Sequence, residues 1–222
     1  MIRHKLPLSL DHIVAAVLSA TYVREFEYGE RAPVLFHSRA EHRSACLSCI
    51  FSTVAYLEAD INELFANAEE GHADGLAKDP IVLTRIRAAW ELVQRSATLD
   101  KYDLALALCD QPVFNKGESP YQAVALLVRL RNALIHFKPE WQPGGGFTDE
   151  ESELSKLSKS LMKSFPENSL AETYQPYFIQ RCLGYGSSKW AITSSVAFVK
   201  EFRARINAGF SPTYVLPFVD KL

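Results

Sequence analysis

Apolar residues recur at the three- and four-residue spacing of a helix along most of the chain. The longest such stretch covers residues 38–69, where six apolar positions form one stripe: Ile50, Val54, Leu57, Ile61, Leu64 and Phe65. Ser38 and Glu41, at its start, have the spacing of a capping box, in which each side chain bonds the other residue's backbone N–H. The stretch therefore predicts a helix of roughly 45 Å, at about 1.5 Å per residue, which is long enough to span a domain.

Other helix starts are marked by a capping residue followed by proline. Asp79-Pro80 and Ser119-Pro120 each place proline at the first helical position, where its missing N–H costs nothing. These starts predict helices over residues 80–93 and 121–137, and a final helix is predicted over residues 187–207.

Three more helices are expected outside these four. They cover residues 9–26, 102–109 and 148–163, and the last is a polar helix expected at the surface, beginning with a capping box at residues 148–151. A mobile Pro- and Gly-rich loop over residues 139–146 follows the helix over 121–137. The sequence has no sustained two-residue alternation of the kind that predicts strands. The pattern predicts an all-α fold, an antiparallel helical bundle with additional flanking helices and with core helices that start near residues 38, 80, 120 and 187.

Composition limits both the number of domains and the class of partner. The 222 residues contain no linker that would separate two domains, so a single domain over residues 1–222 is expected. Apolar residues make up 48 % and charged residues 23 %, which is ordinary for a globular protein. A net charge of −2 argues against a general nucleic-acid coat protein, so any RNA contact requires a local cluster of Lys and Arg.

The N-terminus has some features of a secretory signal. Basic side chains at residues 3–5 precede an apolar stretch over residues 13–20 that ends in small residues. Asp11 and His12 interrupt the approach, which favours a helix of the mature protein. No apolar run reaches the roughly eighteen residues that a membrane helix requires, and four cysteines are too few for a disulfide scaffold in a chain of this length. We therefore expect a soluble cytoplasmic protein that has no membrane partner.

The most informative polar residues lie near the end of the helix predicted over residues 121–137. At about 100° per residue, Arg129, Asn132 and His136 share one face, whereas Arg131 lies about 140° from His136. Arginine can hold a phosphodiester through two hydrogen bonds, and histidine can move a proton near neutral pH. The same residues are also typical of a solvated helix end, where arginine stems cover apolar neighbours. Spacing alone leaves both interpretations open.

The local sequence over residues 130–137, LRNALIHF, resembles the R-x4-H motif of the HEPN-domain family. Four residues separate Arg131 from His136, and Asn132 occupies the polar place that commonly follows the arginine. Residues 55–64 are similar to the early acidic helix of the family, and a weaker similarity lies around Lys189-Trp190-Ala191. The resemblance implies a HEPN-like core over about residues 38–207.

Many HEPN proteins are metal-independent endoribonucleases that dimerise and place two copies of the motif in one cleft. The resemblance implies that His136 assists attack of an RNA 2′-hydroxyl on the adjacent phosphate, that Arg131 stabilises the phosphorane, and that Asn132 positions the substrate or His136. Further candidates for RNA binding or support are Arg129, Glu58 and Lys138. The implied partners are RNA, a second copy of the chain and, for a toxin or defence effector, a cognate antitoxin or another protein; no cofactor or metal is expected. The alternatives are a noncatalytic helical module that binds RNA, a nucleotide or a protein through the same cleft, and a structural dimer with the motif buried.

Two carboxylates compete for a supporting role on the helix over residues 38–69. Glu58 and Asp60 lie two residues apart, so they cannot both point into one cleft. Glu58 is preferred because its local sequence matches the family pattern, although carboxylates on a helix usually only solvate one face.

Two other signals suggest ligand sites but have simpler interpretations. His42, Cys46 and Cys49 lie at i, i+4 and i+7 and offer three zinc ligands on one helical face, but no second element closes a tetrahedral site. Packing in the core is the favoured interpretation for the cysteines. Residues 184–189 open the final helix and could cradle an anion. They lack the spacing of a phosphate-binding loop and a preceding strand, so a turn and cap are expected.

Overall fold

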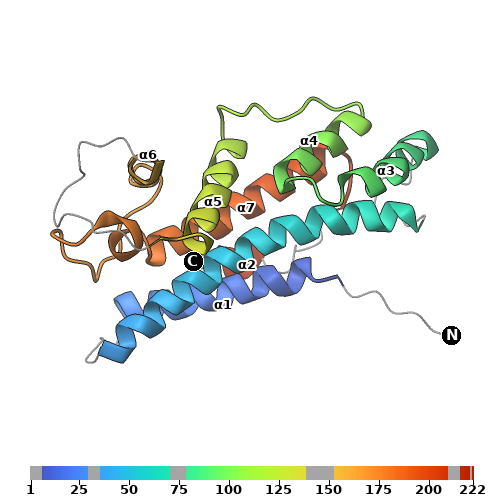
Figure 1. The fold of residues 1–222 in the computed structure, drawn as a ribbon. Coiled ribbons are helices and arrows are strands. Elements are labelled where there is room, and N and C mark those ends of the chain that lie inside the picture. Colours follow the sequence, from blue (N-terminus) through green and yellow to red (C-terminus); the bar gives the residue numbers. More distant parts are fainter. Residues whose placement is uncertain (1–6, 30–35, 71–78, 139–152, 210–215, 221) are drawn as a thin grey trace.

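The computed structural model describes residues 7–29, 36–70, 79–138, 153–209, 216–220 and 222. Every regular element in this part of the chain is helical, which confirms the predicted all-α fold (Figure 1). The elements are α1 (Ser9–Tyr28), α2 (Phe36–Glu69), α3 (Pro80–Val93), α4 (Thr98–Leu108), α5 (Tyr121–Ile135), α6 (Glu153–Leu161), η2 (Tyr177–Arg181), α7 (Tyr185–Arg205) and α8 (Leu216–Val219).

The helix α2 is the centre of the fold and contacts α1, α3, α4, α5 and α7. The six positions of its predicted apolar stripe are each no more than 3 % exposed, which confirms the helix and its buried face. It begins at Phe36, so Ser38 is its third residue and not the N-cap that the capping-box spacing predicts. A capping pattern marks a favourable place for a helix to begin. The helix can still extend beyond it, because each residue added to an existing helix gains a further backbone hydrogen bond.

A segment of α2 also has the length and hydropathy of a membrane span. The candidate is Arg39–Glu69, which reaches a mean hydropathy of 1.3 although its sequence contains no uninterrupted apolar run of that length. Half of the hydrophobic window is buried inside the protein, as is usual for the core helix of a bundle. The absence of a membrane partner therefore stays a prediction.

The core contains α1, a helix that the sequence pattern places outside the core of the bundle. The helix α1 runs antiparallel to α2 and contacts both α2 and α7, so the prediction that it only flanks the bundle is wrong (Figure 1). Ile13, Ala16 and Ala20 are fully buried, and the small side chains of the two alanines let neighbouring helices approach closely. The stretch with features of a secretory signal is thus packed in the core. In α3, expected as a core helix, only Ile86 and Val93 are buried, and this helix lies at the edge.

Only one of the two proline-marked starts is capped as predicted. The carboxylate of Asp79 accepts a hydrogen bond from the backbone N–H two residues later, at 2.8 Å. Ser119 makes no such bond, and Pro120 occupies the N-cap position of α5 in its place. The backbone N–H of Gln122 donates to the backbone carbonyl of Glu118 at 2.8 Å. A backbone acceptor thus replaces the side-chain cap in the first turn of α5.

A cluster of buried side chains joins the N-terminal half of α2 to α5, α6 and the start of α7. Leu157 and Leu161 of α6 belong to this cluster, so the prediction that this polar helix only lies on the surface is wrong for one of its faces. The leucines are four residues apart and form one apolar face on an otherwise polar helix. The loop predicted over residues 139–146 and the capping box at residues 148–151 lie outside the described residues.

Candidate functional site

The polar residues of the motif lie at the C-terminal end of α5. Leu127 and Leu130 are buried on one side of this helix. Arg129, Asn132 and His136 are all exposed on the side that the leucines leave to solvent. The structure therefore confirms that these three side chains share one face.

Arg131 points to a different side of the helix. Its side chain is half-buried, and its Nε is buried with no hydrogen-bond partner among the described residues. This placement follows from the angle of about 140° between residues 131 and 136 on a straight helix. A single chain does not bring Arg131 onto the face that exposes His136.

The helix α5 ends two residues earlier than predicted. Ile135 is its last residue, and His136 is the C-cap, with its backbone N–H donating to the carbonyl oxygen four residues before it at 2.9 Å. The ring of Phe137 packs on that of Phe178, with centroids 6.0 Å apart and ring planes inclined by 27°. This contact draws the chain out of the helix just after His136, and Lys138 beyond it is exposed.

The motif side chains are not engaged elsewhere in the described part of the chain. Arg129, Arg131, Asn132 and His136 form no side-chain hydrogen bond or ion pair with any residue placed there. An imidazole, an amide and a guanidinium on one accessible face can bind an anion and move a proton. The structural-dimer alternative, with the motif buried and ion-paired, finds no support within this single chain.

The function of this face has to be inferred from its own chemistry. No protein-family model, curated protein or solved structure matches the chain. The HEPN resemblance rests on the motif at Arg131 and His136 and on the acidic stretch of α2, and it stays an expectation.

The structure separates the two candidate carboxylates of α2. Glu58 is exposed, but no hydrogen bond or ion pair joins it to the motif among the described residues. Asp60 is buried, and its Oδ1 lies 2.7 Å from an outer nitrogen of Arg203. The hydroxyl of Tyr102 donates to its Oδ2 at 3.0 Å. Asp60 is therefore a core residue, which leaves Glu58 as the accessible carboxylate of the two.

Sequence reasoning did not identify Arg203 as a buried residue. An arginine in the last turn of a helix usually reaches solvent, where it also favours the helix dipole. Burial alone would lower the pKa of the Arg203 guanidinium, but the Asp60 carboxylate outweighs this effect and raises that pKa. Burial and the same carboxylate raise the pKa of Tyr102 well above its usual value. The core thus holds a charged pair together with a neutral hydroxyl donor.

The helical face with His42, Cys46 and Cys49 packs inside the protein. His42 pairs with the carboxylate of Glu27, and the thiol of Cys49 donates to the carbonyl oxygen of Ser188 at 3.7 Å. Burial raises the pKa of the Cys49 thiol to about 12 and that of Cys46 well above its usual value. His42 and Cys49 thus already have partners inside the protein, which supports the packing interpretation. Among the described residues, no group of three His, Cys, Asp or Glu side chains could hold a metal ion.

The carboxylate of Glu27 occupies the N-terminus of α7, where the sequence pattern alone would allow an anion to bind. Gly184 is the N-cap residue, and the N–H of Tyr185 donates to Oε1 of Glu27 at 2.7 Å. His42 bonds the same oxygen at 2.8 Å, and the hydroxyl of Ser169 donates to Oε2 at 3.0 Å. A Cβ at Gly184 would lie 2.7 Å from Oε1, so this close approach requires glycine. The interpretation as a turn and cap is confirmed.

Proposed function

We propose that the protein is a metal-independent endoribonuclease whose active residues lie at the exposed end of α5. The observation that carries the proposal is the shared exposure of Arg129, Asn132 and His136, none of them engaged by another described residue. RNA fits this set because its 2′-hydroxyl is a built-in nucleophile. Cleavage then needs only groups that move a proton and stabilise phosphate charge.

In the proposed reaction, His136 accepts the proton of a ribose 2′-hydroxyl. The 2′-oxygen forms a bond to the adjacent phosphorus, and the bond from phosphorus to the 5′-oxygen of the next nucleotide breaks. A protonated imidazole donates a proton to that leaving oxygen, so the products are a 2′,3′-cyclic phosphate and a 5′-hydroxyl. Asn132 donates hydrogen bonds to the phosphate oxygens, and Arg131 joins it only by extending its long side chain around the helix. Arg129 and Lys138 bind flanking phosphates.

The proposed reaction calls for two copies of the chain, because concerted proton transfer needs both a base and an acid. A two-fold dimer would place both copies of His136 at one cleft. Ile135, which is 51 % exposed beside His136, offers apolar surface for the contact. We expect light scattering to report a dimer, and we expect Ile135→Glu to shift it toward monomer and to slow RNA cleavage.

The matched control for this dimer is Leu92→Glu. Leu92 is 83 % exposed on the peripheral helix α3, so the same change there should leave both the dimer and the cleavage rate unaltered. A monomeric wild-type protein, or a dimer that responds to Leu92→Glu and not to Ile135→Glu, would contradict the arrangement.

The chemistry of the cleaved ends tests the function itself. Mass spectrometry of RNA fragments is expected to show 2′,3′-cyclic phosphates and 5′-hydroxyls, whereas a metal-activated water typically leaves 5′-phosphates and 3′-hydroxyls. The rate should not change in EDTA, and RNA with 2′-deoxyribose at the scissile position should bind but resist cutting. Efficient cutting of the deoxy substrate, or loss of activity in EDTA that zinc or magnesium restores, would rule out the mechanism.

A noncatalytic helical module is the second candidate. The half-burial of Arg131 favours it, because an arginine that stabilises the phosphorane must reach the same phosphate as His136. Such a module would bind RNA, a nucleotide or a protein through this face. Binding would need the positive charge of the face but not the imidazole of His136. RNA binding without cleavage, unchanged in His136→Ala, would favour the module. The toxin or defence role, the cognate antitoxin and the cytoplasmic location stay predictions.

A further inference from the structure

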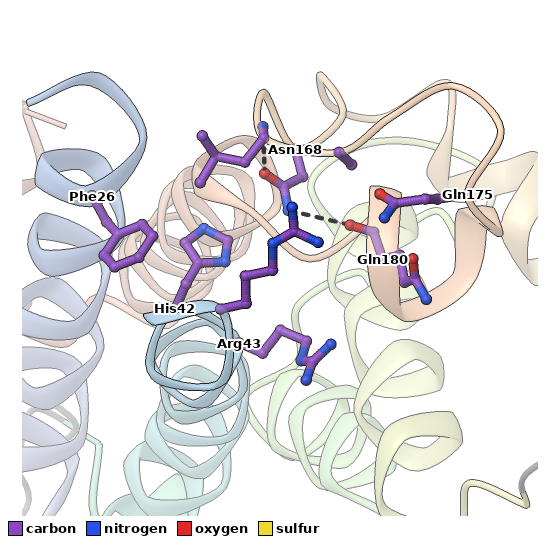
Figure 2. Close-up of a pocket in the computed structure, with 9 residues that line it drawn as sticks. Phe26, His42, Arg43, Asn168, Gln175 and Gln180 are labelled. Atoms are coloured by element: carbon purple, nitrogen blue, oxygen red, sulfur yellow. Dashed lines mark hydrogen bonds between the residues drawn. The ribbon is translucent and has the colours of Figure 1, made fainter. Parts of the chain in front are cut away.

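A pocket lies where the N-terminal part of α2 faces the segment over residues 168–180. Its volume is about 250 Å³, and none of the motif residues of α5 lines it. Figure 2 shows Phe26 and His42 on one side of the pocket and Gln175 and Gln180 on the other, with Arg43 between them. The pocket is therefore a site separate from the exposed end of α5.

The wall over residues 168–180 is preformed by its own hydrogen bonds. The side chain of Asn168 donates to the backbone carbonyl of Gln180 at 3.2 Å and accepts from the N–H of Leu170 at 2.9 Å (Figure 2). The Oε1 of Gln175 accepts from the N–H of Glu172 at 2.9 Å, which leaves its amide nitrogen free to donate. The side chain of Gln180 has no partner among the described residues. Two amide groups thus remain available to a ligand.

The opposite wall carries two positive charges that no other described residue neutralises. Arg39 and Arg43 line the pocket four residues apart on α2, and like charges at this spacing destabilise a helix. Arg39 also lies near the N-terminal end of α2, where the helix dipole disfavours cations. Neither has an ion-pair or hydrogen-bond partner in the described part of the chain. An anion bound in the pocket would offset the repulsion between the two arginines and the unfavourable position of Arg39 on the helix.

No internal carboxylate of the pocket can play this part. The lining residues include no Asp or Glu. The carboxylate of Glu27 lies behind His42, but its oxygens already accept hydrogen bonds from His42, Ser169 and the N-terminus of α7. Both guanidinium groups are exposed to water, so an anion that enters the pocket would displace only solvent from them.

We propose that this pocket binds an organic phosphate monoester. A monoester carries a charge of about −1.5 to −2 at pH 7, which matches the two guanidinium groups of Arg39 and Arg43 better than a singly charged diester does. Guanidinium groups bind phosphate oxygens through paired hydrogen bonds, and the amides of Gln175 and Gln180 can bond hydroxyl or carbonyl groups of the organic part. Sites for drug-sized ligands measure about 300–1,000 Å³, so this smaller pocket suits one sugar phosphate or one terminal nucleotide. The ester is either a free small molecule or the 5′-phosphate end of an RNA strand, and the site does not depend on cleavage at His136.

The test uses the full-length protein with His136→Ala, so that RNA stays intact whether or not the wild-type protein cuts it. Calorimetry compares ribose 5-phosphate with ribose and inorganic phosphate, and fluorescence anisotropy compares a short RNA with and without a 5′-phosphate. The phosphate ester is expected to bind about tenfold tighter than its unphosphorylated counterpart, since charge-assisted hydrogen bonds contribute at least that much. Arg39→Gln with Arg43→Gln should weaken binding roughly tenfold to a hundredfold.

Two further variants separate the pocket from general charge and from folding defects. Arg87→Gln removes an exposed arginine on α3 and should leave the affinity unchanged. Gln180→Glu keeps the side-chain shape, adds a negative charge and should weaken binding even if the double arginine variant folds poorly. A phosphate effect confined to RNA assigns the site to a strand end, and one shared by ribose 5-phosphate assigns it to a free ester. Absence of any phosphate effect, equal affinity for inorganic phosphate, or unchanged binding in folded pocket variants would overturn the proposal.

Discussion

Replacing His136 by alanine is expected to slow RNA cleavage about a hundredfold to ten-thousandfold, the usual contribution of a positioned acid or base. The substitution removes the imidazole that is proposed to take the 2′-hydroxyl proton. His136 is exposed and its side chain has no partner among the described residues, so the free energy of unfolding should change by less than about 0.5 kcal/mol. Steady-state cleavage of a fluorescent RNA and urea denaturation measure the two quantities on the same samples.

The matched control is Gln122→Ala, which removes an exposed polar side chain near the other end of α5. It should leave the cleavage rate unchanged. Arg131→Lys keeps the charge but loses the paired hydrogen bonds of the guanidinium, and it should also slow cleavage. Cleavage that proceeds at the wild-type rate in His136→Ala would show that the activity resides elsewhere.

Replacing Asp60 by alanine should lower the free energy of unfolding by about 3–5 kcal/mol, because one partner of a buried ion pair is then left uncompensated. The guanidinium of Arg203 would remain in the core without its 2.7 Å contact, and the hydroxyl of Tyr102 would lose one of its two acceptors. Urea denaturation should show a lower midpoint with an unchanged slope.

The control for this substitution lies two residues away on the same helix. Glu58→Ala removes an exposed carboxylate and should change stability by less than about 0.5 kcal/mol. If Asp60→Ala does not fold, the double variant Asp60→Ala with Arg203→Met removes the unpaired charge and should restore part of the lost stability. If Asp60→Ala lowers the free energy of unfolding by less than about 1 kcal/mol, or if the double variant is no more stable than Asp60→Ala, the ion pair is not needed for stability.

Features that depend on local spacing can be predicted from the sequence alone. The apolar stripe over residues 50–65 predicts the buried face of α2, and Asp79 with Pro80 predicts the start of α3. The spacing of Arg129, Asn132 and His136 predicts their common exposed face. These features are local because helical periodicity and capping bonds join residues only a few positions apart.

Which polar groups find distant partners depends on the packing of helices that lie far apart in the sequence. Asp60 pairs with a residue 143 positions away, and Glu27 caps a helix 158 positions away, so no local pattern distinguishes them from solvated carboxylates. The half-burial of Arg131 depends in the same way on what packs beside α5, because its long side chain could lie along either side of the helix. The pocket at Arg43 exists because the segment over residues 168–180 faces the N-terminal part of α2, and that placement is set by long-range packing that helical periodicity does not encode.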